Sequence, residues 1–341
     1  MTIPLPLPTP PAVPLPIRKR LERIAGRAAM RVFLGPLRML PLPAARSLGK
    51  CMGWALYQSL GRYRRVALKN LELVYPEKPE RERVQMARAV FRHFGEMAAE
   101  FIKLPQFTRE KVDILATVEG EEHLKQALDS NRGGFIMTGH FGNWEFLARW
   151  LTTHGYKLNV VARDANDPEA TKLMTEVRQG NGAQVLYRGN SARGVLQSLK
   201  RNELVALLTD QNAADVFVPF LGVITGTVDG PAILHLKTRA PLIFSWCVRT
   251  ADDRFHITFE PAVVVEPSAD RAADIRAVTT LINARLEKQI RLYPTQWLWL
   301  HDRWKATPEV FSARKGHAID NSAPAGNVRR EVADLNDSAQ L

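Results

Sequence analysis

Cysteine is scarce in this chain: among 341 residues only Cys51 and Cys247 carry a thiol. The two lie far apart in apolar surroundings, so they form neither a disulfide framework nor the closely spaced thiols of a metal box. This usage indicates a reducing compartment. Long apolar runs are missing too. No stretch of about 18 apolar residues exists, so we expect no membrane-spanning helix.

Several familiar motifs are also missing. The proline-rich stretch 1–16 lacks the basic segment and the unbroken apolar run of a secretory signal, and its prolines predict polyproline II or disorder. No Gly-x-Ser-x-Gly elbow is present, which disfavours a serine nucleophile. No zinc box, RNP pattern or helix-turn-helix accompanies the basic residues, which argues against a nucleic-acid partner.

Positive charge is abundant: 47 lysines and arginines outnumber 35 acids, giving a formal net charge of +12. Such an excess favours an anionic partner. Segment 17–32 has apolar residues at helical spacing beside a stripe of arginines, a pattern typical of a helix lying in an anionic membrane interface. A surface helix packed on its own domain would show the same pattern.

From about residue 112, short apolar runs alternate with helical patterns, whereas residues 44–104 predict helices alone. This alternation predicts an α/β fold, with a mostly parallel or mixed sheet covered by helices. We expect strands at 114–118, 135–137, 158–162, 185–187, 204–208, 242–248 and 255–259. We therefore divide the chain into a Pro-rich disordered tail (1–16), an N-terminal helical, membrane-associating region (17–110), an α/β core (111–310) and a disordered C-terminal tail (311–341).

Segment 133–145 predicts a buried strand, a tight turn and a helix, with His140 in the turn and Glu145 in the first helical turn. On one continuous helix these side chains would point roughly 140° apart, but a histidine in the turn can meet the glutamate. A carboxylate bonded to one ring nitrogen fixes the tautomer and leaves the other nitrogen free to take a proton. We therefore predict a general-base dyad. The alternative is a turn histidine bonded to backbone, beside an ordinary first-turn acid.

Polar residues also follow the other predicted strands where each ends. In a parallel sheet these ends meet at one edge, where ligands bind. Together the residues favour a binding site, although each alone would suit a solvated loop. They are Arg163, Arg188, Asp210 and Gln211.

The box His140-Phe-Gly-Asn-Trp-Glu145, preceded by Gly139, resembles the motif of the lipid A biosynthesis lauroyl/myristoyl acyltransferases, a branch of the lysophospholipid acyltransferase-like superfamily. Further similarity spans roughly residues 20–305. It includes Val161-Ala-Arg163 with Arg178-x-x-x-Gly182, the block that starts at Asp210-Gln-Asn, and a terminal box over 293–304. The terminal box departs from the family at Thr295, where glutamate is usual.

The resemblance implies O-acyl transfer from an acyl thioester, on acyl carrier protein, to a hydroxyl of a phosphorylated lipid A precursor. His140 and Glu145 would be catalytic, and no metal or other cofactor is required. The residues expected to bind substrate are Arg163, Arg178, Asp210, Gln211 and Arg303, since arginine suits phosphate. His235 and His301 are expected to be structural.

The resemblance also implies a location on the cytoplasmic face of the bacterial inner membrane, as a peripheral or monotopic protein on an anionic membrane surface. Two alternatives stay open. One is an acyltransferase of the same fold that acts on another glycolipid or phospholipid. The other is a non-catalytic lipid-binding protein.

Overall fold

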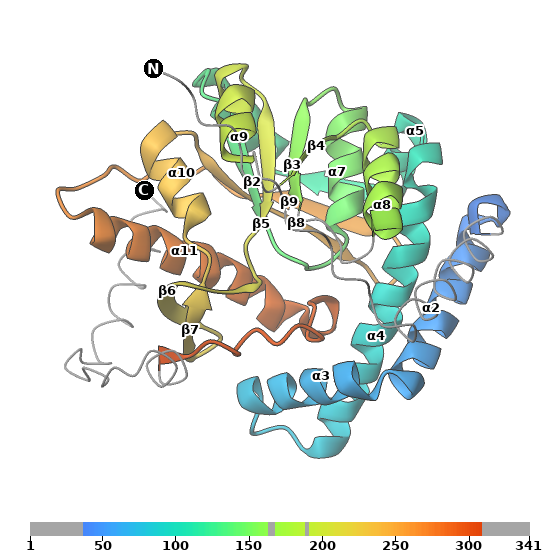
Figure 1. Ribbon diagram of the computed structural model, residues 1–341. Coiled ribbons are helices and arrows are strands. Elements are labelled where there is room, and N and C mark those ends of the chain that lie inside the picture. The colour runs from blue at the N-terminus through green and yellow to red at the C-terminus, as the bar shows by residue number, and fades with distance from the viewer. Residues whose placement is uncertain (1–36, 163–167, 188–190, 309–341) are drawn as a thin grey trace, which may run out of the picture.

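The computed structural model describes residues 37–162, 168–187 and 191–308 (Figure 1). The proline-rich tail, the basic segment 17–32, Arg163, Arg188 and the C-terminal tail lie outside these residues. Within the described part, none of the helices is both long and apolar enough to cross a bilayer.

A seven-stranded sheet forms the centre of the molecule, in the order β1-β9-β8-β2-β5-β3-β4. All neighbours pair in parallel except β8 and β9, which form the expected antiparallel hairpin. The predicted α/β class and mixed sheet are therefore confirmed. The strands are β1 (Ala116–Glu119), β2 (Gly134–Thr138), β3 (Leu158–Ala162), β4 (Gln184–Tyr187), β5 (Leu204–Leu208), β8 (Leu242–Arg249) and β9 (Phe255–Phe259).

One strand begins later than the pattern predicted. Ile114 and Leu115 belong to helix α5 (Arg109–Leu115), which starts where the Thr108 hydroxyl accepts a hydrogen bond from the Lys111 N–H. An N-cap of this kind favours a helix over an extended start. β1 is correspondingly short.

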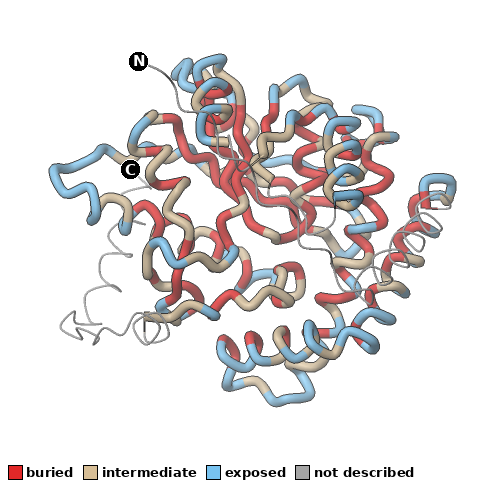
Figure 2. Tube along the Cα trace, in the orientation of Figure 1, coloured by how far each residue is buried: buried red, intermediate tan, exposed pale blue. Residues whose placement is uncertain are grey.

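Alternating side chains bury both faces of the sheet, as a strand's period of two requires. In β2, Phe135 and Met137 join one apolar cluster while Ile136 joins the other. Helix α11 (Arg271–Leu292) packs on the first cluster and α7 (Trp144–Thr153) on the second. The buried residues run through the middle of the molecule (Figure 2). The other helices of this part are α6 (Glu121–Asp129), α8 (Pro168–Gly180), α9 (Ser191–Lys200) and α10 (Gly230–Thr238).

The predicted N-terminal helices are present as α2 (Leu42–Ser59), α3 (Gly61–Val74) and α4 (Glu80–Lys103). They lie at one side of the sheet (Figure 1). Helices α2 and α4 approach very closely, because a Cβ added at Gly95 would lie 2.2 Å from the Gly49 carbonyl oxygen. This close approach brings the buried end of α4 against the turn that carries His140.

A two-stranded hairpin, β6 (Asn212–Phe220) and β7 (Val223–Thr227), follows directly after β5 and was not predicted. It pairs with neither edge of the main sheet. Hydrogen bonds tie it to the chain that follows α11: the Gly226 N–H donates to the Ala306 carbonyl at 2.8 Å, and the Asn212 side chain donates to the Arg303 carbonyl at 3.0 Å. The hairpin therefore holds the terminal box beside the end of β5.

Candidate active site

The turn between β2 and α7 carries His140, as the sequence predicted. Asn143 caps α7, its side-chain oxygen accepting from the Phe146 N–H at 2.9 Å. Gly142 adopts φ +59°, and a Cβ there would lie 2.0 Å from the Cys247 carbonyl oxygen. Only glycine fits such a backbone position, because any side chain would clash with the carbonyl of Cys247.

Asp210, not Glu145, orients the His140 ring. The ring nitrogen Nδ1 lies 2.9 Å from one carboxylate oxygen of Asp210, and the His140 N–H donates to the other at 3.0 Å. The indole N–H of Trp297 donates to that second oxygen at 2.9 Å. Asp210 is 3% exposed, whereas the His140 side chain is 22% exposed. The ring is therefore held from its buried side while its other edge remains accessible.

The protonation of this pair follows from its contacts. Burial raises the pKa of Asp210, but the positive charge of His140 and the hydrogen bonds from His140 and Trp297 outweigh burial and lower the pKa to about 2. An ionised carboxylate can only accept, so Nδ1 of His140 carries the proton. In the uncharged ring the lone pair then resides on Nε2, which is the arrangement that a general base requires.

The expected contact between Glu145 and His140 is not formed. Glu145 instead accepts from Arg178 of α8, with Nη2 at 2.6 Å and Nε at 3.1 Å, and from the indole of Trp144 at 3.1 Å. Across the described ranges no hydrogen bond or ion pair joins Glu145 to His140. The reason lies in the sheet: β2 and β5 are parallel neighbours with Thr138 level with Leu208, so the residues two places further on, His140 and Asp210, come together.

The residues predicted to bind substrate have different surroundings. Arg178 is paired with Glu145, and its side chain is 16% exposed. Asp210 is occupied by His140, whereas Gln211 is exposed to solvent. Arg163 lies outside the described residues. The substrate-binding roles of these residues stay predictions.

Arg303 is fully buried and forms hydrogen bonds within the protein. Its side chain has no exposed surface, donates to the Gly226 carbonyl and the Thr227 hydroxyl at 2.6 Å each, and lies over the Phe220 ring. Burial lowers the pKa of this guanidinium to about 10, with the charge of Asp210 acting in the opposite direction. The unpredicted β6–β7 hairpin therefore covers the side chain, and the substrate-binding role of Arg303 stays a prediction.

Two backbone N–H groups of the turn, which could otherwise donate to an oxyanion at this site, form hydrogen bonds within the protein. The Gly142 N–H donates to the Gln296 carbonyl and the Asn143 N–H to the Cys247 carbonyl, each at 2.8 Å. Both bonds fasten the turn to its neighbours. These two N–H groups are therefore not available to an oxyanion at this site.

Buried residues of α4 hold the turn by hydrogen bonds. His93 donates from Nε2 to the Gly142 carbonyl at 3.0 Å, and Glu100 accepts from the Asn143 side-chain amide at 2.7 Å. Glu100 also accepts from Arg46 and Arg249 at 2.5 Å each, so its buried charge is compensated. These contacts link the N-terminal helices to the geometry of the His140 turn, a role that the sequence alone did not reveal.

His93 predicts a pH dependence of stability. Burial, aided by the charge of Arg249, lowers the pKa of His93 to about 4, against the opposing effects of the Gly142 carbonyl and Glu100. The unfolded chain takes up this proton near pH 6.5 and the folded chain only near pH 4. The contribution of His93 to the free energy of unfolding is thus complete above pH 6.5 and falls by about 3 kcal/mol as the pH drops to 4.

The variant His93→Gln tests this, because the glutamine amide can still donate to the Gly142 carbonyl. We expect urea unfolding of the variant to lose less stability than wild type between pH 7 and pH 4. His256→Gln, at a partly exposed position, serves as the matched control. If the free energy of unfolding fell equally with pH in wild type and in His93→Gln, the lowered pKa of His93 would be refuted as the cause.

The described part of the chain contains no group of three or more histidine, cysteine, aspartate or glutamate side chains arranged to hold a metal ion. What the site offers is a buried carboxylate, an accessible imidazole and, next to them, a buried glutamate–arginine pair on α7 and α8. Fold and site together define a protein able to move a proton at the carboxyl edge of an α/β sheet.

Comparison with known proteins gives the class. The family model for bacterial lipid A biosynthesis acyltransferases matches residues 17–306, so the chain belongs to this family and is an acyltransferase. Similar curated proteins include a lipid A biosynthesis palmitoleoyltransferase and a lipid A biosynthesis lauroyltransferase, both of Escherichia coli (strain K12). The first is 28% identical over 79% of this chain and 87% of the relative; the second is 26% identical over 81% and 90%. A phosphatidylinositol mannoside acyltransferase of Mycolicibacterium smegmatis (strain ATCC 700084 / mc(2)155) is 25% identical over 70% of this chain and 78% of its own length.

Proposed function

We propose that this protein transfers a fatty acyl chain from the thioester of an acyl carrier protein to a hydroxyl of a phosphorylated lipid A precursor, with His140 as general base. The observation that carries the proposal is the pairing of His140 with buried Asp210 in a chain of this family. The net charge of +12 suits its anionic partners: carrier protein, glycolipid phosphates and membrane surface.

The proposed reaction needs one proton carrier. Nε2 of His140 takes the proton from the lipid hydroxyl as its oxygen attacks the thioester carbonyl. The tetrahedral intermediate then collapses, the carbon–sulfur bond breaks, and the leaving thiolate receives the proton from His140. Asp210 stays ionised throughout and stabilises the transient imidazolium.

Glu145, predicted as the partner of His140, is proposed to act through Arg178 instead. Hydrogen bonds from Nε and Nη2 of the guanidinium hold the pair. The Trp144 indole that donates to Glu145 packs edge-on against the His140 ring, with 5.1 Å between ring centres. Glu145 would thereby fix both Arg178 and the wall of the site beside the base. Arg178, Arg163 and Gln211 remain the proposed contacts to substrate.

Membrane association is proposed to involve segment 17–32, whose arginines suit anionic headgroups, with the sheet domain on the cytoplasmic side of the inner membrane. The proposed acceptor would then be reached from that surface. A vesicle-binding assay with the four arginines of the stripe, Arg20, Arg23, Arg27 and Arg31, changed to glutamine tests this part separately.

A second acceptor class has support of its own. The Mycolicibacterium smegmatis relative is named for phosphatidylinositol mannoside, so a related scaffold acts on a different glycolipid. The alternative for this chain is acyl transfer to another phosphorylated glycolipid by the same His140 chemistry.

The test is acyl transfer from acyl carrier protein to a tetra-acylated, Kdo-bearing lipid A precursor, read by mass spectrometry. Wild type should add the mass of one acyl chain, and His140→Ala should not. Transfer by wild type to phosphatidylinositol mannoside alone would favour the alternative acceptor. Transfer that survives in His140→Ala would overturn the mechanism.

Trp297 provides a smaller prediction. Trp297→Phe keeps an aromatic side chain but removes one of the hydrogen bonds to Asp210, worth about 1.5–3 kcal/mol to a charged group, so kcat should fall at least about tenfold. Trp299→Phe is the control, since that indole donates to the Pro294 carbonyl at 2.7 Å and does not touch Asp210. Equal kcat values for the two variants would show that the indole does not support the carboxylate.

A further inference from the structure

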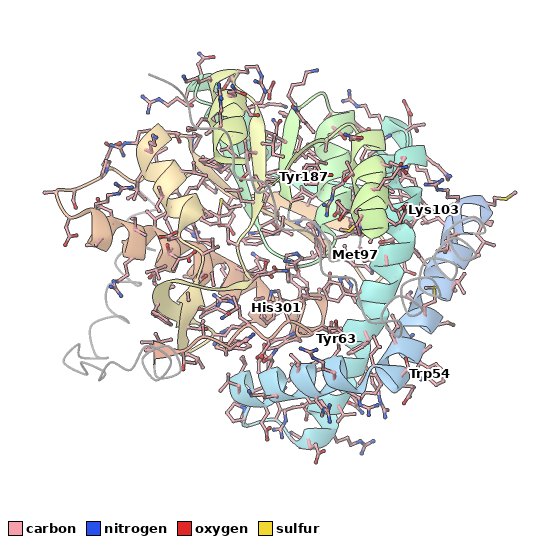
Figure 3. All side chains as sticks on the ribbon, viewed as in Figure 1. Trp54, Tyr63, Met97, Lys103, Tyr187 and His301 are labelled. Atoms are coloured by element: carbon pink, nitrogen blue, oxygen red, sulfur yellow. The ribbon has the colours of Figure 1, made fainter. Side chains whose placement is uncertain are left out.

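His301 lies in the terminal box, four residues after Trp297, between α3–α4 and the β6–β7 hairpin (Figure 3). Its ring nitrogen Nε2 accepts a hydrogen bond from the Asn212 N–H at 3.0 Å. A backbone N–H can only donate, so Nε2 must hold a lone pair and the ring proton must sit on Nδ1. His301 is therefore an uncharged donor whose tautomer the fold has already chosen.

The electrostatic surroundings agree with a neutral ring close to the reacting groups. Burial lowers the pKa of His301, as do the positive charges of His140 and Arg303, whereas the charge of Asp210 raises it. Backbone hydrogen bonds connect the two histidines: the Leu298 N–H donates to the His140 carbonyl at 3.1 Å, and the His301 N–H donates to the Leu298 carbonyl at 3.2 Å. A neutral donor at this place does not compete with His140 for the proton.

The backbone that carries His301 is fixed on both sides. The buried side chain of Asn70, on α3, donates to the His301 carbonyl and to the Trp299 carbonyl, each at 2.8 Å. The Asn212 side chain donates to the Arg303 carbonyl at 3.0 Å. Donors held in this way lose little freedom when they bind a ligand, which is the condition for a strong contribution to catalysis.

His235 shows what a purely structural histidine looks like in this fold. Its Nδ1 lies 2.8 Å from the Ala240 carbonyl and its Nε2 accepts from the Val265 N–H at 2.9 Å, so both nitrogens are satisfied internally. His301 differs. Within the described residues its Nδ1 has no hydrogen-bond partner, and the side chain is only partly buried.

We propose that the Nδ1–H of His301 donates a hydrogen bond to an oxygen of the bound substrates. The inference rests on the proposed function, because it assigns a role within the same site. Two substrate oxygens can take this bond: the thioester carbonyl oxygen, which becomes an oxyanion during attack, and an oxygen of the phosphorylated acceptor. The Gly142 and Asn143 N–H groups are committed elsewhere, which leaves room for a side-chain donor to the carbonyl.

Two variants separate this role from a structural one. His301→Gln can keep an acceptor for the Asn212 N–H at the former Nε2 position but has no donor at the Nδ1 position. His301→Asn can place an amide donor near the Nδ1 position and loses the acceptor. A structural role predicts that glutamine is the better replacement, whereas substrate donation predicts that asparagine is.

The measurement is kcat and KM for acyl transfer, with thermal unfolding of each variant as a check on folding. A bond to the carbonyl predicts that His301→Gln lowers kcat about 10²-fold with little change in KM. A bond to the acceptor predicts a KM raised about tenfold with kcat kept. In either case His301→Asn should be the more active variant. Wild-type kcat and KM in a folded His301→Gln would overturn the proposal.

Hydrolysis of the acyl carrier protein thioester, with no lipid present, keeps this test apart from the proposed function. Water replaces the lipid hydroxyl but the same carbonyl oxygen gains charge, so a carbonyl donor is needed whatever the acceptor. Wild type that hydrolyses the thioester yet fails to acylate the lipid A precursor would refute the acceptor and not the role of His301. Equal hydrolysis and equal transfer by wild type and His301→Gln would refute the role of His301 alone.

Discussion

Asp210→Asn is expected to lower kcat for acyl transfer by about 10³-fold and to leave KM nearly unchanged. The amide that replaces the carboxylate presents an N–H₂ group as readily as an oxygen to Nδ1 of His140, so the ring can turn to the tautomer with its proton on Nε2. That tautomer cannot take a proton from the lipid hydroxyl. The charge that would stabilise the imidazolium is lost as well.

The matched control is Asp215→Asn, an exposed position on β6 of the hairpin that follows Asp210. It makes the same chemical change without touching His140 and should keep wild-type kcat. An Asp210→Asn variant that retains more than a tenth of wild-type kcat would show that the carboxylate does not set the tautomer of His140.

Arg178→Met is expected to lower the free energy of unfolding by about 3–5 kcal/mol, because it removes the cation paired with the buried charge of Glu145 and leaves it the Trp144 indole N–H. Glu145 is 4% exposed, and the guanidinium supplies the shortest of its hydrogen bonds, at 2.6 Å. The double variant Glu145→Leu/Arg178→Met removes both charges and fills the space with apolar atoms. It should recover most of the lost stability while remaining impaired in acyl transfer.

The measurement is the free energy of unfolding by urea for wild type, Arg178→Met, Glu145→Leu and the double variant, which together form a double-mutant cycle. The exposed pair Lys78 and Glu82, with 3.1 Å between nitrogen and oxygen, provides the comparison, since such surface pairs are worth about 0–1 kcal/mol. An Arg178→Met variant as stable as wild type, or a double variant no more stable than Arg178→Met, would contradict a coupled buried pair.

The fold could be predicted from the sequence because each sheet strand is an apolar run that punctuating residues separate from the next helix. The turn at His140 followed from Gly139, Gly142 and the N-cap Asn143, which are local signals. The β6–β7 hairpin was not predicted. Neither strand alternates cleanly between buried and exposed side chains, since β6 lies mostly at half-exposed positions and β7 ends in three buried residues.

The partner of His140 could not be predicted because it depends on which strands are neighbours. Glu145 is five residues away in the sequence, whereas Asp210 is 70 residues away and reaches the ring only because β5 lies beside β2 in register. Both acids were recognised as site residues, but the order of strands decides which of them meets the histidine. The burial of Arg303 has the same kind of cause, since the hairpin that covers it lies about 80 residues earlier in the chain.

The central claim, that Asp210 holds His140 as a general base, is tested most directly by nitrogen NMR of histidine-labelled protein near neutral pH. The His140 signals would be assigned by their loss in His140→Gln. The structure predicts that the uncharged ring carries its proton on Nδ1 in wild type and in Glu145→Gln, and that the tautomer changes in Asp210→Asn. An uncharged wild-type ring with its proton on Nε2, or a tautomer that changes in Glu145→Gln and not in Asp210→Asn, would contradict it.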